Sequence, residues 1–147
     1  MNQPTSTWIE FHDSQIRYLA VSEAGLVLSL YAVVHSDPNG NGPYTGWQEH
    51  RLLFKGFTFT CSKLEHGEKV DVYLSDGAVK VDGRDMNQLL ASNAAFTGAI
   101  EVSLWPSPNF ARLLITAGSL RVEPVGPLKW ERKPPQDALA PSASASK

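Results

Sequence analysis

The sequence predicts an all-β protein, an antiparallel sandwich or barrel with one short helix. Apolar and polar residues alternate over many short segments, and turn-forming residues separate these segments at intervals of ~8–12 residues. A chain of 147 residues, of which 42% are hydrophobic, is long enough to bury one core. These observations together indicate one domain made of short strands.

The clearest alternating segment spans residues 25–35, with the sequence GLVLSLYAVVH. One face of this strand would carry only apolar residues, and the other face is apolar except for Ser29 and His35 at its polar positions. A strand that is apolar on both faces usually lies in the middle of a sheet covered on both sides. We therefore expect this strand at the centre of the core.

Further strands are predicted on both sides of this segment. They are Trp8–Phe11, Ile16–Val21, Arg51–Cys61, Val70–Leu74, Ala78–Val81, Ala99–Trp105, Phe110–Ala117 and Leu120–Val125. Gly56 interrupts one of these patterns and suggests a bend at which the strand could pass from one sheet to another. Ser75–Gly77 predicts a tight hairpin turn, and Gly118 lies in a further break.

Only Asp85–Ala95 has a helical pattern, with Met86, Leu89 and Leu90 at compatible spacing and Asp85 as its N-cap. We expect one short connecting helix there. Residues 131–147 are rich in proline, alanine and serine and cannot bury enough apolar surface to offset their ordering entropy. The chain is therefore expected to form a single β domain over residues 1–130, followed by a disordered tail over residues 131–147.

Charge and cysteine content exclude several classes of function. The net charge is −2, so the chain lacks the basic surface that nucleic acid or an anionic membrane would attract. Cys61 is the one cysteine, which excludes an intrachain disulfide and a cysteine-based zinc site. The first residues lack a secretory signal, and no apolar run approaches the ~18 residues of a membrane-spanning helix. We expect a cytoplasmic protein with no cofactor.

The loop that follows the central segment has the spacing of half a calcium site. Asp37, Asn39 and Asn41 would occupy the first, third and fifth ligand positions of a calcium loop. The bidentate acid that should follow at the twelfth position is replaced by the neutral Gln48. Because Asp, Pro, Asn and Gly also favour turns for conformational reasons, we prefer a plain turn.

Two histidines could meet if the first two strands form a hairpin. Pairing Ile16 with Leu30 aligns the apolar faces and sets His12 opposite Val34, away from His35. This register disfavours a metal or catalytic site shared by the two histidines, although a metal-dependent enzyme remains an alternative. We expect Asp13 and Ser14 to hold a local turn or bulge through their side chains.

Aromatic residues give the strongest indication of a binding surface. Tyr44 and Trp47 follow the glycine-rich loop, and exposed Tyr and Trp often anchor protein or sugar partners. The same two residues could instead close the end of a small β domain. We take Tyr44 and Trp47, together with His35, His12 and Asp13, as candidate binding residues.

The first fifty residues also contain two recognisable motifs. Phe11-His12-Asp13-Ser14 matches an F-H-D-S-x-[I/L] opening, and His35, Gly46 and Trp47 match a VVHxS…G…GW loop. With these motifs the chain resembles small uncharacterised bacterial β-rich proteins, and a similar FHD opening occurs in some polymorphic-toxin immunity proteins. The resemblance implies an all-β bacterial cytosolic domain without assigned catalysis.

These observations predict a non-enzymatic protein that binds a protein partner, as an immunity protein does, or associates with itself. A small-molecule or carbohydrate binding module is the first alternative. A metal-dependent enzyme that uses the His12 and His35 region is the second.

Overall fold

The computed structural model describes residues 6–61, 72–86, 89–106 and 112–132. The strands in these ranges are β1 (Trp8–Ser22), β2 (Gly25–His35), β3 (Tyr44–Lys55), β4 (Thr58–Cys61), β5 (Val72–Val81), β6 (Arg84–Asp85), β7 (Leu89–Ala91), β8 (Ala95–Pro106), β9 (Leu113–Pro124) and β10 (Lys129–Arg132). No helix occurs among the described residues. The prediction of an all-β protein is confirmed.

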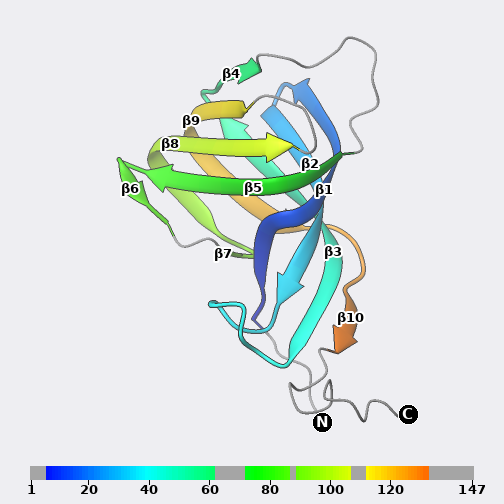
Figure 1. Ribbon diagram of the computed structural model, residues 1–147. Coiled ribbons are helices and arrows are strands. Elements are labelled where there is room, and N and C mark those ends of the chain that lie inside the picture. The colour runs from blue at the N-terminus through cyan, green and yellow to red at the C-terminus, as the bar shows by residue number, and fades with distance from the viewer. Residues whose placement is uncertain (1–5, 62–71, 87–88, 107–111, 133–147) are drawn as a thin grey trace, which may run out of the picture.

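The long strands close into an antiparallel barrel of six strands (Figure 1). Around the ring the order is β1, β2, β3, β9, β8 and β5, and β5 pairs with β1 to complete it. In Figure 1, β5 and β8 run across the view, whereas β1, β2 and β3 run steeply down it. Four short strands extend the sheet outside the ring, because β4 pairs with β9, β6 with β5, β7 with β1 and β10 with β3. Of the two predicted architectures, the barrel is the one that forms.

The predicted helix over Asp85–Ala95 is wrong. Asp85 ends β6, and β7 lies antiparallel to Trp8–Glu10 of β1. Leu90 is buried in this short strand and belongs to the core, so an apolar spacing that suits a helix is used for strand pairing. Contact with the rest of the barrel outweighs a weak local preference for helix. Residues 87 and 88, in the middle of the predicted helix, lie outside the described residues.

Two predicted turns are also wrong. β5 runs through Ser75–Gly77 with only a shift of register, and β9 runs without a break through Gly118. The tight turn forms at Asp82 and Gly83 instead, where φ is 52° and 81° and the flanking residues of β5 and β6 pair directly. Asp-Gly with positive φ at both positions is the preferred two-residue hairpin turn. The sequence therefore contains the hairpin signal at Asp82-Gly83 and not at Ser75–Gly77.

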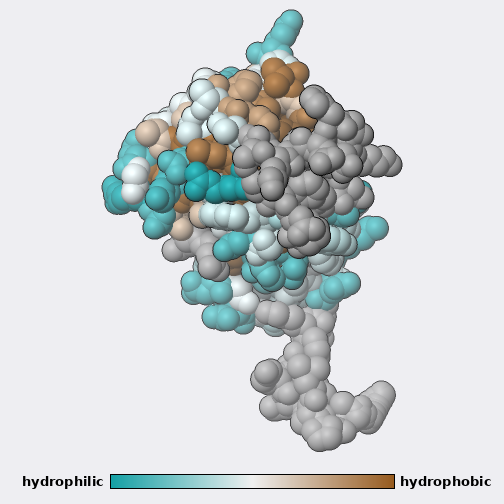
Figure 2. Space-filling model, turned by 45° about the horizontal axis from the view of Figure 1, so that its top comes forward, coloured by the Kyte–Doolittle hydropathy of each residue, from teal (hydrophilic) through white to brown (hydrophobic). Residues whose placement is uncertain are grey.

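The bend predicted at Gly56 is confirmed. Gly56 has a φ of 61° and separates β3 from β4, which pair with successive parts of β9. The strand therefore kinks but remains next to the same neighbour in one continuous sheet. Beyond the bend, Phe57 and Phe59 pack against the core. Figure 2 turns this end of the barrel toward the viewer, where apolar surface gathers among polar side chains.

The strand expected at the centre of the core is β2. It pairs with β1 on one side and with β3 on the other. Its inward side chains Leu28, Leu30, Ala32 and Val34 are completely buried. On its outer face Ser29 and His35 are buried as well, whereas Val27 and Tyr31 stay partly exposed, so this face is covered only in part and not along its length as expected.

The predicted hairpin of β1 and β2 has the expected pairing only at its middle. Ile16 lies opposite Leu30, but a shift of register at Arg17 places Tyr18 opposite Ser29. A larger irregularity between Glu10 and Gln15 removes His12 from the ladder, so the predicted pairing of His12 with Val34 is wrong. Each extra residue in a strand displaces the pairing of all residues beyond it.

The predicted tail, residues 131–147, overlaps the last two residues of the last described strand. β10 continues through Glu131 and Arg132, opposite Thr45 and Tyr44 of β3. Residues 133–147, which make up the rest of the predicted tail, lie outside the described residues.

Ser14 holds the larger bulge of β1 in place. Its hydroxyl donates to the carbonyl oxygen of Glu10 at 2.5 Å and accepts from the backbone N–H of Val33 at 2.9 Å. The residue is fully buried, and Asp13 beside it has a φ of 70°. The expectation that Ser14 supports a bulge through its side chain agrees with this geometry.

We predict that Ser14→Ala lowers the free energy of unfolding by about 1–3 kcal/mol, because the buried Val33 N–H loses its partner. Urea denaturation measures this change. As a control, Ser6→Ala removes an exposed hydroxyl just before β1 and should change stability by less than about 0.5 kcal/mol. Equal effects of the two substitutions would contradict the role of Ser14.

Candidate functional site

The bulge in β1 turns two candidate residues toward solvent. The side chains of His12 and Asp13 are 56% and 70% exposed, and His12 Nδ1 lies 3.3 Å from Asp13 Oδ2. Phe11 and Ser14 on either side of them are buried. The FHDS motif therefore forms a bulge that anchors its first and last residues in the barrel and presents the middle two outside.

His35 lies in a different environment. Its Nε2 is 2.6 Å from Glu10 Oε1, and the ring is buried on the outer face of β2. Gly40 in the following loop packs over it, since a side chain at Gly40 would lie 3.8 Å from the ring. Within the described residues, His35 Nδ1 and the neighbouring Thr45 Oγ1 are buried without a hydrogen-bond partner. A buried His35 paired with Glu10 and an exposed His12 paired with Asp13 do not form one site.

The loop with calcium-like spacing is organised around Asp37. One carboxylate oxygen of Asp37 accepts hydrogen bonds from the backbone N–H groups of Asn39 and Asn41, at 2.9 and 3.3 Å. The carbonyl of Asp37 accepts a further bond from the N–H of Gly40. An aspartate that caps its own turn in this way is the arrangement expected of a plain turn.

Trp47 takes part in a stack on the outer face of the barrel. Its ring lies 5.4 Å from that of Tyr31, with 17° between the two planes. The guanidinium carbon of Arg17 lies 5.1 Å from the centre of the Tyr31 ring. We call Arg17, Tyr31 and Trp47 the aromatic ladder, which crosses β1, β2 and β3 in that order.

Polar and aromatic residues flank the aromatic ladder. Glu49 lies opposite Tyr31, and its carboxylate accepts a hydrogen bond of 2.8 Å from the buried hydroxyl of Ser29. On the other side, Gln15 lies opposite Tyr31 and also opposite Tyr73 of β5, which is 53% exposed. The outer face from β3 to β5 is thus rich in aromatic side chains around a fixed central stack.

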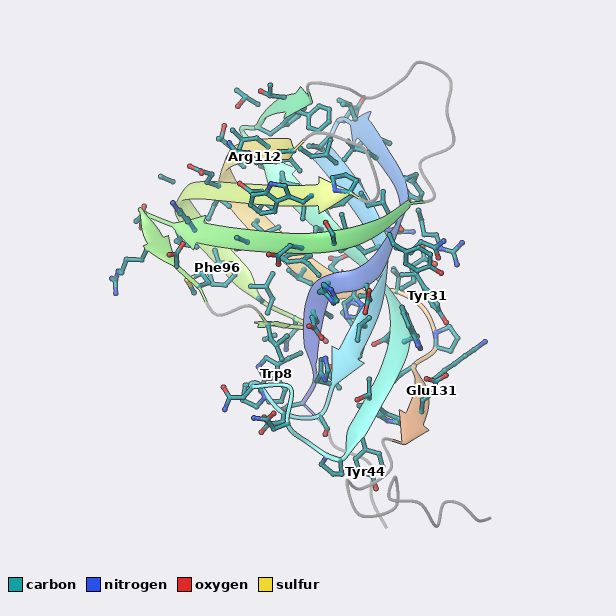
Figure 3. All side chains as sticks on the ribbon, in the orientation of Figure 1. Trp8, Tyr31, Tyr44, Phe96, Arg112 and Glu131 are labelled. Atoms are coloured by element: carbon teal, nitrogen blue, oxygen red, sulfur yellow. The ribbon has the colours of Figure 1, made fainter. Side chains whose placement is uncertain are left out.

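Tyr44 is separate from this surface. Its ring packs against that of Trp130 in β10, with 5.5 Å between ring centres. Tyr44 and Trp47 are three residues apart in one strand, so they point to opposite faces of β3. In Figure 3, Tyr31 projects from the side of the barrel, and Tyr44 lies at its lower end. Of the two candidate aromatics, Trp47 belongs to the ladder and Tyr44 closes the end of the domain.

Tyr31 and Arg17 were not among the binding residues predicted from the sequence. A signal for Tyr31 was present, since a hairpin that pairs His35 with Thr45 places Tyr31 and Trp47 on one face of neighbouring strands. No comparable signal exists for Arg17, because its position depends on the register shift in β1.

A third histidine, His50, lies inside the barrel. It is fully buried, opposite Leu30 of β2 and Pro124 of β9. Its Nδ1–H donates to the carbonyl of Gln48 at 3.1 Å, and Nε2 has no partner within the described residues. Burial lowers the pKa of His50, and the hydrogen bond to Gln48 only partly opposes this shift. His50 is therefore a neutral core residue at pH 7.

Comparison with known proteins gave no relatives: no family model, curated protein or solved structure matches the chain. Within the described ranges, no three or more His, Cys, Asp or Glu side chains are grouped so that they could hold a metal ion. No helix in the same ranges could cross a membrane. The candidate site thus rests on the geometry of the aromatic ladder.

We predict that stability falls on acidification because of His50. Its pKa in the folded state lies below its ordinary value of 6.5, so the unfolded chain binds the proton more readily. The free energy of unfolding is therefore highest above pH 6.5, where His50 is neutral in both states. It decreases as the pH falls below 6.5, by up to about 1.4 kcal/mol per pH unit. Urea denaturation between pH 7.5 and 5 measures this slope.

In His50→Leu the slope should become smaller over the same pH range. His12→Gln, which removes an exposed histidine, serves as the control and should retain the slope of the unmodified chain. If His50→Leu keeps the full slope, another group is responsible for it.

Proposed function

We propose that this chain is a non-enzymatic binding protein that takes a protein partner on the outer face of β1, β2 and β3. The aromatic ladder is the observation that carries the proposal. Trp, Tyr and Arg are the residue types most often found at the energetic centre of protein interfaces. Here one of each is stacked on a single outward face of the barrel.

The rigidity of the ladder supports a role in binding. Tyr31 is held by Trp47 and Arg17, and all three residues are attached to strands of a closed barrel. A side chain that is already fixed loses little conformational entropy when a partner binds. Partly exposed aromatic rings that already pack against one another therefore give a favourable anchor.

The charges around the ladder suggest the chemistry of the partner surface. Arg51 is exposed on this face, and the nearby carboxylate of Glu49 is engaged by Ser29. A complementary surface would have an apolar centre that covers Trp47 and a carboxylate at the edge. Charges placed in this way favour specificity and fast association more than affinity.

The similarity of the Phe11–Ser14 motif to FHD-type immunity proteins makes a toxin the first partner to test. In this role the chain would act in the bacterial cytoplasm and bind a toxin domain encoded by a neighbouring gene. A second copy of the chain is the other protein partner that the same face could accept. The partner would in both cases cover the aromatic ladder.

We predict that Trp47→Ala weakens binding to such a toxin domain by about 2 kcal/mol or more, which corresponds to about thirtyfold or more in Kd. Tyr31→Ala should have a similar effect, because Trp47 then loses its stacking neighbour. Isothermal titration calorimetry with the purified domain measures both changes, and thermal melting checks that each variant is folded.

Trp105→Ala is the matched control, since Trp105 is a 37% exposed tryptophan on β8, outside the ladder. It should leave the affinity unchanged. Sedimentation velocity of the full chain tests self-association, and a dimer that Trp47→Ala dissociates would identify a second copy as the partner. A monomeric chain that binds no neighbouring toxin domain, or a ladder that can be removed without effect, would contradict the proposal.

A further inference from the structure

A hollow of about 280 Å³ lies where β3, β9 and β8 run side by side. Two rows of cross-strand neighbours form it. Leu53, Arg121 and Ala95 make the first row, and Lys55, Ser119 and Thr97 make the second. Residues two apart in a strand share a face, so both rows lie on the outer face of the barrel.

The hollow exists because side chains of different length meet there. Ala95, Thr97 and Ser119 are short, whereas Leu53, Lys55 and Arg121 are long and rise around them. Phe96, between Ala95 and Thr97, faces inward and packs against the core, and its label in Figure 3 stands on the other side of the view from Tyr31. The floor therefore combines apolar contacts with the hydroxyl groups of Thr97 and Ser119.

Positive charge predominates around the hollow. Lys55 makes no ion pair within the described part of the chain. Arg121 contacts Glu123 at 2.8 Å, but Glu123 also lies directly opposite Arg51. Glu123 thus lies next to two arginines, and no carboxylate lines the hollow itself among the described residues. A ligand with a negative charge could form ion pairs with both Lys55 and Arg121.

We propose that this hollow binds a small amphipathic anion, a carboxylate or sulfonate attached to a compact aromatic or aliphatic body. Lys55 and Arg121 hold the acid group from neighbouring strands, and Leu53 and Ala95 contact the apolar body. The volume is near the lower end of the range of about 300–1,000 Å³ for ligand pockets, which favours a ligand of one or two rings.

This site is distinct from the aromatic ladder. Leu53 lies six residues along β3 from Trp47, which corresponds to about 20 Å in an extended strand. Loss of one site should leave the other intact. The two proposals can therefore succeed or fail separately.

The test uses 8-anilinonaphthalene-1-sulfonate, a fluorescent aromatic sulfonate, titrated against the full chain. Its neutral analogue N-phenyl-1-naphthylamine has the same rings without the sulfonate and is the matched ligand control. We expect saturable binding of the sulfonate at one site, with an affinity at least about tenfold higher than that of the neutral analogue. Added salt should weaken the binding.

Two variants locate the bound sulfonate. The double variant Lys55→Gln and Arg121→Gln should weaken binding by about tenfold or more, since both charged contacts are lost. Ala95→Trp should abolish binding by filling the hollow. Lys129→Gln, on β10, and Trp47→Ala, on the ladder, are the controls and should bind the sulfonate as the unmodified chain does.

The proposal is overturned if the double variant keeps its affinity, if Trp47→Ala reduces it as much, or if the neutral analogue binds equally well. Thermal melting of each variant confirms that it is folded. Because Lys55 and Arg121 are exposed, their replacement tests the site even if Ala95→Trp disturbs the strand.

Discussion

The pairing of β3 with β9 is the constraint on which the rest of the structure depends. β3 also pairs with β2 on its other side. The additional pairing with β9 joins the two ends of the sheet and closes it into a barrel. Closure leaves β3 with one inward face, filled by buried Leu52 and Phe54, and one outward face. A slip of one residue would exchange the two faces. The register of β3 thus determines that Trp47 and Lys55 both point outward.

The same strand also brings polar groups into poorly hydrated positions. His50 points into the barrel, and Thr45 is covered on the outside next to His35. Buried groups without partners cost free energy that apolar packing must offset. The completely buried leucines of β2 opposite β3 supply such packing. The core can therefore tolerate His50 while it is neutral. Protonation of this one side chain lowers the stability of the barrel.

Sequence alone could predict the features that depend on local pattern. Alternation located the central strand β2, and the lone glycine within an apolar run located the bend at Gly56. The helix prediction failed because the spacing of Leu89 and Leu90 suits a helix and a strand alike, and only the neighbouring β1 decides between them. In the site, Trp47 was identified by residue type. Tyr31 could be placed beside it by pairing the two strands as a hairpin, whereas the position of Arg17 depends on the register shift in β1.

The short strands outside the ring have a consequence for aggregation. In the described part of the chain, the strands that end the sheet (β4, β6, β7 and β10) contain between two and four residues. A long, unpaired strand edge is a template on which further chains can add and grow into fibrils, and short edges do not provide it. These four short strands therefore offer little backbone for strand addition, and side chains on the barrel wall form the larger surface through which copies or a partner could assemble.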